Sequence, residues 1–373
     1  MNAAKYRCQA CGWSGPEDPA LLSCPRCGSL LELEYDVDPE LPEPAELVRC
    51  RRGVWCFSRQ LPKLGPEPTL GEGATPLREV RLRGARVLLK LESANPTGSF
   101  KDRGTPVALA SALARGIGVV CEDSSGNAGA SLACYARAHG LKALIVTPRT
   151  APRGKLKLVE LCGAEVALAE SRESARALAI ELSRGRGAIY LPHTTMPHHV
   201  EGMKTLAYEI FLQLSGSPSH VFVPVSSGTG LLGLYKGFRE LREWGYIDEL
   251  PRLIAVQSSA VPPLYEAFWG EKPSSREDST LADGLTLERP PRLRAMVEAV
   301  RATRGTVVVA TNEEIRRAAA RLRDYGVVAE PTSAAALAAL EKLSAEEAVD
   351  EPLVVITGSG LKLIDELLEL TNI

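Results

Sequence analysis

The sequence lacks the features that direct a chain to membranes or nucleic acids. Its 44 basic and 46 acidic side chains give a net charge of −2, so electrostatics provide no reason to expect a nucleic-acid or anionic-membrane partner. No apolar run approaches the length that spans a bilayer, and Met1–Lys5 leads into no signal-peptide core. Internal repeats and long low-complexity segments are also missing. We therefore expect a cytoplasmic protein with neither kind of partner.

The chain has the size and apolar content of a globular protein with more than one domain. Its 373 residues suggest two domains and a small appendage, and an apolar content of 45% is ordinary for a protein with a proper core. Arginine outnumbers lysine, while asparagine and glutamine are scarce. This bias is typical of a heat-loving source, although genomic base composition produces the same bias.

Four of the nine cysteines form two C-x-x-C pairs, Cys8 with Cys11 and Cys24 with Cys27. Two thiolates from each pair can bind one zinc ion tetrahedrally and leave no open coordination position, so we predict a structural zinc ribbon over residues 1–36. Reduced thiols without metal, or two disulfides, are the alternatives. The ribbon lacks a basic, aromatic-rich face for nucleic acid. The other cysteines are most simply packing residues: Cys50, Cys56, Cys121, Cys134 and Cys162.

Beyond a proline- and glutamate-rich linker at 38–46, short β-branched segments alternate with helical ones. The predicted strands are 87–91, 118–121, 143–146, 221–225, 252–256, 306–309 and 353–356. The predicted helices are 106–113, 127–139, 155–162, 174–182, 201–214, 231–243, 313–325, 333–343 and 363–370. This alternation predicts an α/β fold with mostly parallel sheets, whose ligands bind at the carboxyl ends of the strands.

Lys101 is the first candidate for catalysis. It lies in the segment 95–104, Asn-Pro-Thr-Gly-Ser-Phe-Lys-Asp-Arg-Gly, between a predicted strand and a helix that has Pro106 in its first turn. The positive end of a helix dipole disfavours a protonated lysine there. A neutral, partly buried amine is what Schiff-base chemistry with an aldehyde cofactor needs. Taken alone, a solvated surface lysine is the ordinary alternative.

A loop of small residues at 124–129, Ser-Ser-Gly-Asn-Ala-Gly, follows a predicted strand and begins a helix. Its backbone N–H groups can bind a carboxylate or a phosphate. Asn127 can donate its amide to a phenolic oxygen while capping the helix. A plain helix cap with a glycine turn is the alternative.

Two further loops follow predicted strands. The spacing of Gly228, Gly230 and Gly233 imitates a dinucleotide fingerprint, but the next strand ends in Gln-Ser-Ser at 257–259 and offers no acidic residue for a ribose. A single phosphate monoester suits this loop better. Thr357, in Thr-Gly-Ser-Gly, can hydrogen-bond a neutral ring nitrogen, or the segment can be an ordinary glycine turn.

From about Thr75 to its end, the chain resembles the pyridoxal-phosphate enzymes of the tryptophan-synthase-β fold type. It is most similar to the threonine synthases, whose Asn-Pro-Thr-Gly-Ser-Phe-Lys-Asp-Arg-Gly segment residues 95–104 match in full. The resemblance implies two open, mostly parallel sheet domains besides the ribbon. It implies a large cofactor-binding domain, 37–110 with 215–373, and a small α/β domain, 111–214.

The same resemblance implies roles for individual residues. Lys101 would bind the pyridoxal phosphate covalently and move protons. The other cofactor-binding residues would be Asn127, Ser226, Ser227, Gly228, Thr229, Gly230 and Thr357. The substrate carboxylate would be held by Ser124, Ser125, Gly126 and Ala128.

The chain departs from threonine synthases where the substrate phosphate is expected to bind. Many of those enzymes have Asn-Pro-Tyr-Arg before Glu-Gly-x-Lys-Thr, whereas residues 196–205 read Met-Pro-His-His-Val-Glu-Gly-Met-Lys-Thr and place His199 at the arginine position. This exchange removes a bidentate, permanent charge. Lys155 or Lys204 are candidates to compensate. The nearby histidines at 193, 198 and 199 suggest either a metal site or an active-site loop.

The function that the resemblance implies is conversion of O-phospho-L-homoserine and water to L-threonine and phosphate by β,γ-replacement. The alternatives are a related pyridoxal-phosphate enzyme acting on phosphoserine, of cysteine or cysteate synthase type, or a serine/threonine dehydratase. A zinc-ribbon binding protein with an inactive enzyme domain belongs to another class. Relatives of this fold are commonly dimers, so we expect a homodimer whose other partner is an amino-acid substrate.

Overall fold

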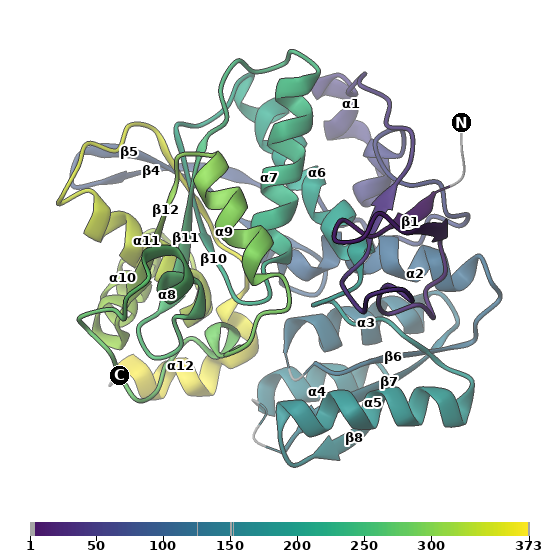
Figure 1. The fold of residues 1–373 in the computed structure, drawn as a ribbon. Coiled ribbons are helices and arrows are strands. Elements are labelled where there is room, and N and C mark those ends of the chain that lie inside the picture. The colour runs from purple at the N-terminus through teal and green to yellow at the C-terminus, as the bar shows by residue number, and fades with distance from the viewer. Residues whose placement is uncertain (1–3, 125, 150, 152, 372–373) are drawn as a thin grey trace. The chain divides into compact units, whose positions relative to one another are not determined.

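The computed structural model describes residues 4–124, 126–149, 151 and 153–371 (Figure 1). The chain divides into two compact units, and each contains its own parallel sheet. The first unit consists of Met1–Ala74 and Lys101–Thr205, and the second of Thr75–Phe100 and Leu206–Ile373. The predicted α/β fold with mostly parallel sheets is thereby confirmed.

Residues 37–74 and 101–110 belong to the first unit, and residues 206–214 belong to the second. A shared apolar cluster joins the first two of these segments. Trp55 and Leu61, from the linker region, pack with Val107 and Ala110 of the following helix. No local sequence pattern reports such a contact between distant segments.

The sheet of the second unit has the strand order β12-β11-β10-β13-β5-β4. All neighbours are parallel except the hairpin of β4 and β5 at one edge. The strands are β4 (Leu77–Leu82), β5 (Ala85–Lys90), β10 (His220–Pro224), β11 (Arg252–Ser258), β12 (Thr306–Ala310) and β13 (Pro352–Val355). All of the predicted strands in this part of the chain are confirmed, and β4 is an edge strand that the sequence analysis missed.

Helices cover this second sheet in two groups. Alternate residues of the strands, such as Phe222, Ile254 and Val354, pack in one cluster with α11, and α10 packs on α11. The helices α7, α8 and α9 contact β10, β11 and β12 and pack against one another. The bounds are α7 (Thr229–Glu243), α8 (Pro263–Trp269), α9 (Leu293–Ala302), α10 (Asn312–Asp324), α11 (Pro331–Leu343) and α12 (Ile364–Thr371).

The sheet of the first unit has the order β8-β7-β6-β9, with every pair parallel. Cys121, Leu144 and Val146 pack on α5, whereas Val120 and Ile145, which alternate with them, pack with α2 and α3. The strands are β6 (Val119–Glu122), β7 (Lys142–Pro148), β8 (Glu165–Ala169) and β9 (Ile189–Tyr190). The helices are α2 (Thr105–Leu113), α3 (Asn127–Ala138), α4 (Arg153–Leu161), α5 (Arg172–Arg186) and α6 (Pro197–Leu214).

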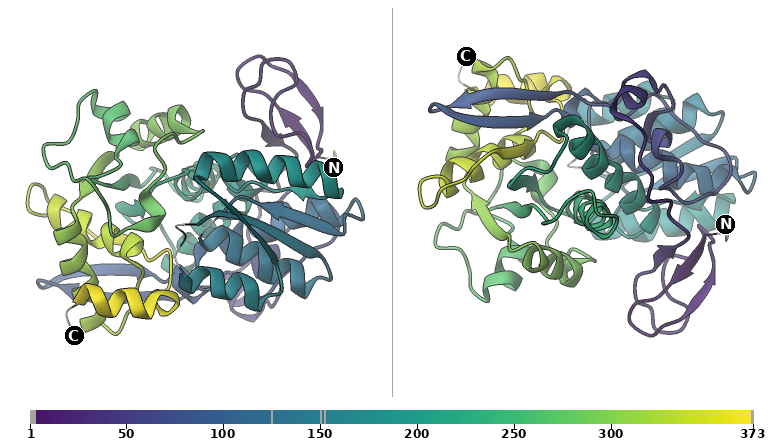
Figure 2. Two further views of the ribbon diagram at one scale, coloured as in Figure 1. Left: turned by 90° about the horizontal axis from the view of Figure 1, so that it is seen from below. Right: turned by 90° about the horizontal axis from the view of Figure 1, so that it is seen from above.

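The N-terminal ribbon, which we define as residues 4–36, is a small antiparallel sheet that is visible in purple in Figure 2. Its order is β2-β1-β3, from β1 (Lys5–Arg7), β2 (Ser14–Pro16) and β3 (Glu32–Glu34). Tyr6, Leu31 and Leu33 form its core with Cys8 and Cys24. The short helices of the chain are α1 (Pro44–Arg49), η1 (Gly53–Phe57), η2 (Glu92–Ala94), η3 (Phe100–Arg103), η4 (Asp283–Leu285) and η5 (Gly360–Leu363).

The prediction that the remaining cysteines only pack is wrong for two pairs. Cys50 is bonded to Cys56, and Cys134 to Cys162, with Cα–Cα distances of 6.1 and 5.1 Å. Both distances lie in the range that a disulfide requires. Cys121 is buried with a free thiol, as expected for a packing residue. Because each pair is brought together by folding, the spacing of the cysteines in the sequence does not reveal it.

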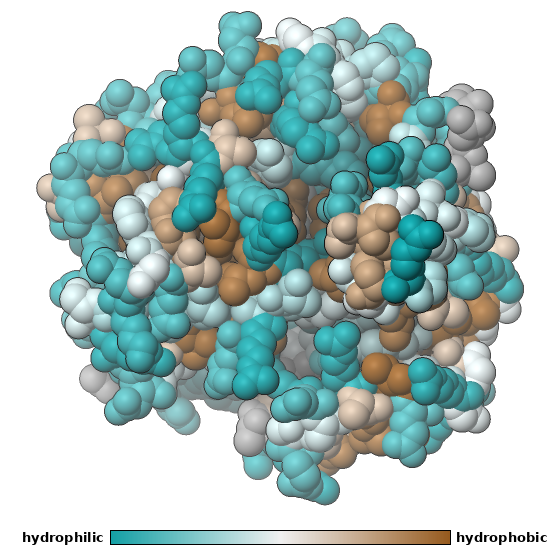
Figure 3. All heavy atoms as spheres, in the orientation of Figure 1, coloured by the Kyte–Doolittle hydropathy of each residue, from teal (hydrophilic) through white to brown (hydrophobic). Residues whose placement is uncertain are grey.

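The surface of the chain carries few extended apolar areas on the face shown in Figure 3, where hydrophilic side chains dominate. Among the described residues, no helix is both long enough and apolar enough to cross a membrane.

Candidate functional site

Lys101 lies in η3, directly before α2, and its neighbours are firmly held. Asp102 accepts a hydrogen bond from Ser131 Oγ at 2.7 Å, and Thr105 Oγ1 donates to the Lys101 carbonyl at 3.1 Å. Burial lowers the pKa of the Lys101 amine from 10.5 to about 8, and the nearby Glu122 carboxylate opposes this change. The neutral amine that Schiff-base chemistry needs is therefore accessible near neutral pH, mainly through burial.

Two glycines let α6 approach the lysine segment closely. A Cβ atom on Gly104 would lie 2.6 Å from Nδ1 of His199, and one on Gly202 would overlap the carbonyl oxygen of Arg103. Arg103 is itself fully buried and donates to Thr205 Oγ1 at 3.3 Å. The first turns of α6 therefore pack directly on the residues that follow Lys101.

The loop at 124–129 folds back on the start of α3. Ser124 Oγ accepts from the backbone N–H of Gly126 at 3.3 Å, and a Cβ atom on Gly129 would lie 2.5 Å from the Ser124 carbonyl oxygen. Asn127 is the first residue of α3, and Ala128 is buried next to it. Ser125, which we also predicted to hold the substrate, lies outside the described residues.

Lys155 is the predicted substrate residue that the structure brings to this loop. It is buried on α4, and a Cβ atom on Gly126 would lie 4.0 Å from its Cδ. Lys204 lies elsewhere: its ammonium is 3.5 Å from a Glu201 carboxylate oxygen and 5.2 Å from the centre of the Tyr35 ring. Of the two lysines, Lys155 is therefore the one beside the small-residue loop.

An acidic pair at the end of β6, of which Glu122 is buried and Asp123 is half-buried, was not predicted from the sequence. Glu122 accepts the backbone N–H of His193 at 3.1 Å, and its other oxygen lies 3.1 Å from His193 Nδ1. Burial raises the pKa of Glu122 to about 7, and burial together with Glu122 raises that of Asp123 to about 7. Two acidic residues at the carboxyl end of a buried parallel strand are a signal that could have identified them.

His199 is close to the same group. Its ring is buried, and the ring centres of His193 and His199 are 6.4 Å apart in an edge-to-face arrangement. Burial lowers the pKa of both imidazoles well below 6.5, so both rings are neutral at neutral pH. His198 points away from them, because its Nε2 lies 2.9 Å from Glu17 of the ribbon.

In the second unit, the predicted phosphate loop joins β10 to α7. Gly228 adopts a positive φ of 88° immediately before α7, which begins at Thr229. The Ser227 and Thr229 hydroxyls are buried and 3.4 Å apart. Hydroxyl and N–H groups at a helix N-terminus suit a phosphate monoester.

Thr357 and the residue before Lys101 lie together in this second unit. The Phe100 N–H donates to the Thr357 carbonyl at 2.9 Å, and the Phe100 ring lies 2.9 Å from where a Gly230 Cβ would be. The Thr357 hydroxyl is buried, 3.1 Å from Ser333 Oγ. Phe100 therefore contacts both predicted cofactor loops, and Lys101 follows it in the chain.

The four ribbon cysteines converge as predicted. Their sulfur atoms all lie within 4.8 Å of one another, and the Cys8–Cys27 and Cys11–Cys24 sulfur separations are 3.5 and 3.6 Å. Tetrahedral zinc with Zn–S bonds of about 2.3 Å needs separations of about 3.8 Å, so the donor set fits a zinc ion. In the described part of the chain, this is the one group of His, Cys, Asp and Glu side chains that could hold a metal.

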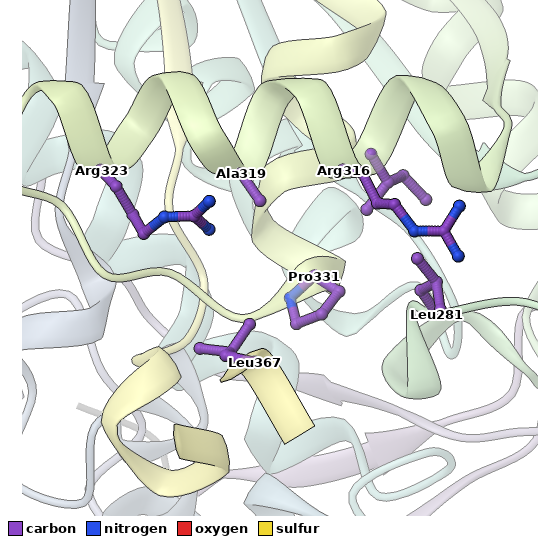
Figure 4. Close-up of a pocket in the computed structure, with 7 residues that line it drawn as sticks. Leu281, Arg316, Ala319, Arg323, Pro331 and Leu367 are labelled. Atoms are coloured by element: carbon purple, nitrogen blue, oxygen red, sulfur yellow. The ribbon is translucent and has the colours of Figure 1, made fainter. Parts of the chain in front are cut away.

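A small pocket in the second unit is lined by arginine and apolar side chains instead of metal ligands (Figure 4). Arg316, Ala319 and Arg323 of α10 line it, opposite Pro331 and Leu367. Its cavity volume of about 20 Å³ is enough for a water molecule only. We assign no ligand to it.

Comparison with known proteins identifies the family. The sequence model for the pyridoxal-phosphate dependent enzymes matches residues 68–360. The chain belongs to this family. Threonine synthase of Methanocaldococcus jannaschii is 34% identical over 95% of this chain and 92% of that protein, and threonine synthase of Mycobacterium bovis is 34% identical over 81% and 85%. Maize serine racemase has the same fold, with a TM-score of 0.68, 21% identity and coverage of 80% of this chain and 93% of that one.

As a pyridoxal-phosphate dependent enzyme, the chain offers groups that fit the cofactor. The loop with Gly228 and Thr229 provides hydroxyl and N–H donors for a phosphate. Thr357 supplies a hydroxyl in place of a carboxylate, which suits a neutral pyridine nitrogen. Lys101 supplies an amine whose pKa is lowered by burial.

Proposed function

We propose that this enzyme is a threonine synthase, which converts O-phospho-L-homoserine and water to L-threonine and inorganic phosphate. The observation that carries the proposal is the similarity to threonine synthases over 95% of the chain. The segment 95–104, with Lys101, also resembles the lysine segment of the threonine synthase family, which supports the proposal.

Pyridoxal phosphate, when bound, supplies an electron-withdrawing ring that stabilises the negative charge left when the substrate loses its α-proton. The residues of the chain supply binding and proton transfer. Lys101, with its pKa near 8, would hold the cofactor and would accept and return the protons of the substrate. We assign the substrate carboxylate to Ser124, Ser125, Gly126 and Ala128.

The cofactor contacts follow the same proposal. Ser226, Ser227, Gly228, Thr229 and Gly230 bind the cofactor phosphate. Asn127 donates to the phenolic oxygen, and Thr357 donates to the ring nitrogen. The glycine-rich start of α7 supports the first assignment, since it leaves backbone donors accessible.

The neutral histidines favour a second candidate. His199 replaces the expected arginine, burial keeps its imidazole uncharged, and the acidic Glu122 lies near His193. A site with weaker attraction for a phosphate is compatible with dehydration of serine or threonine, which carry none. Phosphoserine as substrate would need another cation in place of the arginine. Lys155, beside Gly126, is the buried cation that we propose binds a substrate phosphate.

A steady-state assay that follows phosphate and threonine together tests the function. We expect one threonine for each phosphate released from O-phospho-L-homoserine, and no turnover of O-phosphoserine or threonine. Production of a keto acid from threonine, or phosphate release from O-phosphoserine alone, would show the second candidate to be correct.

A matched pair of variants tests the role of Lys155. Lys155→Met should raise KM for O-phospho-L-homoserine about tenfold or more, because it removes a charge-assisted hydrogen bond to the phosphate. Lys157→Met removes an exposed lysine from the same helix and should leave KM unchanged. Equal effects of both variants would exclude a specific role for Lys155.

We also propose that Cys8, Cys11, Cys24 and Cys27 bind a structural zinc ion, and that the enzyme is a cytoplasmic homodimer. The converging sulfur atoms support the zinc proposal. Metal analysis of the purified protein should find one zinc per chain, and Cys8→Ser with Cys11→Ser should abolish it. Sedimentation equilibrium should give twice the chain mass.

A further inference from the structure

The first two turns of α6 are contacted from two directions within the first unit. His198 and Glu201 face the N-terminal ribbon, whereas His199 and Gly202 face the residues that follow Lys101. The helix therefore lies between the ribbon and the lysine segment.

The first ribbon contact is Glu17, directly after β2. Its carboxylate accepts from Ser111 Oγ at 2.6 Å and lies 2.6 Å from an Arg115 guanidinium nitrogen and 2.9 Å from His198 Nε2. Although burial raises the pKa of Glu17, hydrogen bonds from His198, Ser111 and Arg115 lower it to about 2. Glu17 therefore bears a charge that holds α2 and α6 together.

The second ribbon contact is Tyr35, directly after β3. Its hydroxyl donates to Glu201 at 2.6 Å, and the Lys204 ammonium lies 3.5 Å from Glu201 and 5.2 Å from the centre of the Tyr35 ring. Glu201 and Lys204 are 2% and 0% exposed, respectively, so this network is shielded from water. A buried polar network of this kind fixes one geometry, because every alternative leaves a charge or donor unpaired.

On the opposite side, the first turns of α6 pack tightly against the residues that follow Lys101. The missing side chains of Gly104 and Gly202 allow direct contact with His199 and with Arg103, as described above. On the ribbon side, the crevice between the ribbon and the segment that leads into α6 holds only about 10 Å³. A displacement of the ribbon contacts would therefore be transmitted to the lysine segment.

We propose that the ribbon is a positioning element for catalysis, in which Glu17 and Tyr35 fix the first turns of α6 and thereby set the positions of Lys101 and the His199 ring. Neither residue touches the reacting atoms. The ribbon also makes apolar contacts, such as that of Leu22 with the core beneath α5. Its contacts with His198 and Glu201 on the first turns of α6, in contrast, are made by the buried Glu17 carboxylate and by the hydroxyl of the half-buried Tyr35. The proposal does not depend on which amino acid is the substrate.

Two conservative variants of the holoenzyme test this proposal, Glu17→Gln and Tyr35→Phe. Glu34→Gln is the matched control, since it changes an exposed ribbon carboxylate that pairs only with Lys5 and Arg7 in its salt bridges. The first measurement is a pH titration of the visible absorbance of the bound cofactor without substrate. This absorbance reports the surroundings of Lys101 and is independent of the proposed reaction.

For Glu17→Gln and Tyr35→Phe we expect a displaced titration midpoint, and kcat/KM lower by about 10- to 100-fold, the range for a misplaced catalytic group. Zinc content and the control variant should be unchanged. If both variants titrate like the wild type and keep kcat/KM, even with a lower Tm, the ribbon only stabilises the fold and the proposal is wrong. Should Glu17→Gln fail to fold, Tyr35→Phe decides alone, because it removes a single hydroxyl.

Discussion

At the scale of single residues, the first unit concentrates ionisable groups whose pKa values are moved by burial. The pKa of Lys101 is lowered to about 8 and that of Glu122 is raised to about 7, so both values lie near neutral pH. His193 and His199 are held neutral beside them. Groups with pKa values near neutral pH are suited to proton transfer. The acidic pair at the end of β6 therefore has this property in common with Lys101.

Replacing Lys101 tests the central assignment. Lys101→Ala should abolish both turnover and the visible absorbance of the bound cofactor, because no other amine would hold the cofactor covalently. Lys142→Ala, which changes an exposed lysine in β7 of the same unit, should keep both. Absorbance spectra and the phosphate assay decide the matter, and a coloured, active Lys101→Ala enzyme would refute the assignment.

The pKa of Glu122 predicts a pH-dependent stability. Burial raises this pKa from 4.5 to about 7, so between these values the folded state binds more protons than the unfolded state. The contribution of Glu122 to the free energy of unfolding should therefore fall as the pH rises from about 5 to about 7, by roughly 3 kcal/mol.

Glu122→Gln removes this titration. Chemical unfolding at several pH values should show the variant gaining stability relative to the wild type as the pH rises. The matched control, Glu160→Gln on the exposed face of α4, should show a constant difference. A pH-independent difference for Glu122→Gln as well would mean that Glu122 is ionised throughout.

These residues also show which parts of the candidate site can be predicted from the sequence and which cannot. Lys101 and the small-residue loop with Asn127 were recognisable because each lies in a contiguous motif. Glu122 and His193 are 71 positions apart, and their contact exists only because β6 and the segment after β9 meet. The burial that raises the pKa of Glu122 is likewise a property of the packed sheet.

At the scale of elements, the first turns of α6, which belong to the first unit up to Thr205, contact several functional segments. One turn of the helix contacts the ribbon, the segment after Lys101 and the ring of His193. The glycine at 202 is what permits the closest of these contacts. A glycine inside a helix costs about 1 kcal/mol relative to alanine, so its presence indicates that close packing matters there.

A glycine-to-alanine pair tests this point. Gly202→Ala should lower the Tm and kcat, because its methyl group would overlap the Arg103 carbonyl and displace the segment that holds Lys101. Gly185→Ala in α5 meets no atom within 4 Å and should stabilise the protein by about 0.5–1 kcal/mol through helix propensity. Thermal unfolding and the phosphate assay provide the comparison, and unchanged kcat in Gly202→Ala would contradict the expected displacement.

Most long elements were predictable because their apolar patterns are local. The predicted elements include the central strands of both sheets and the helices that cover them, from α2 to α12, except α8 and α9. The elements that were not predicted also include β8, the two-residue β9 and the edge strand β4. Short or edge elements bury too little apolar surface for a clear pattern and are defined by their neighbours.

At the scale of the whole molecule, the first unit holds both disulfides that the described residues form. The Cys50–Cys56 and Cys134–Cys162 bonds belong to it, together with the four clustered ribbon cysteines. The second bond ties α3, which begins at Asn127, to the end of α4, which carries Lys155.

Removing the longer cross-link should cost considerable stability. The Cys134–Cys162 bond joins residues 28 positions apart, so Cys134→Ser with Cys162→Ser should lower the free energy of unfolding by about 3–4 kcal/mol. Thermal unfolding with and without a thiol reductant measures the effect, and the reductant should change this transition less in the double variant, which keeps the Cys50–Cys56 bond. Detection of free thiols at both positions in the unreduced, unfolded protein would show that the bond does not form.

The sequence alone determined the chemistry and the class of fold, since the lysine segment, the cysteine pairs and the strand–helix alternation are written in adjacent residues. Only the tertiary structure decided which distant groups meet: Glu122 with His193, Glu17 with α6, and Cys134 with Cys162. These contacts depend on burial and on the approach of segments far apart in the chain. Neither property has a local pattern.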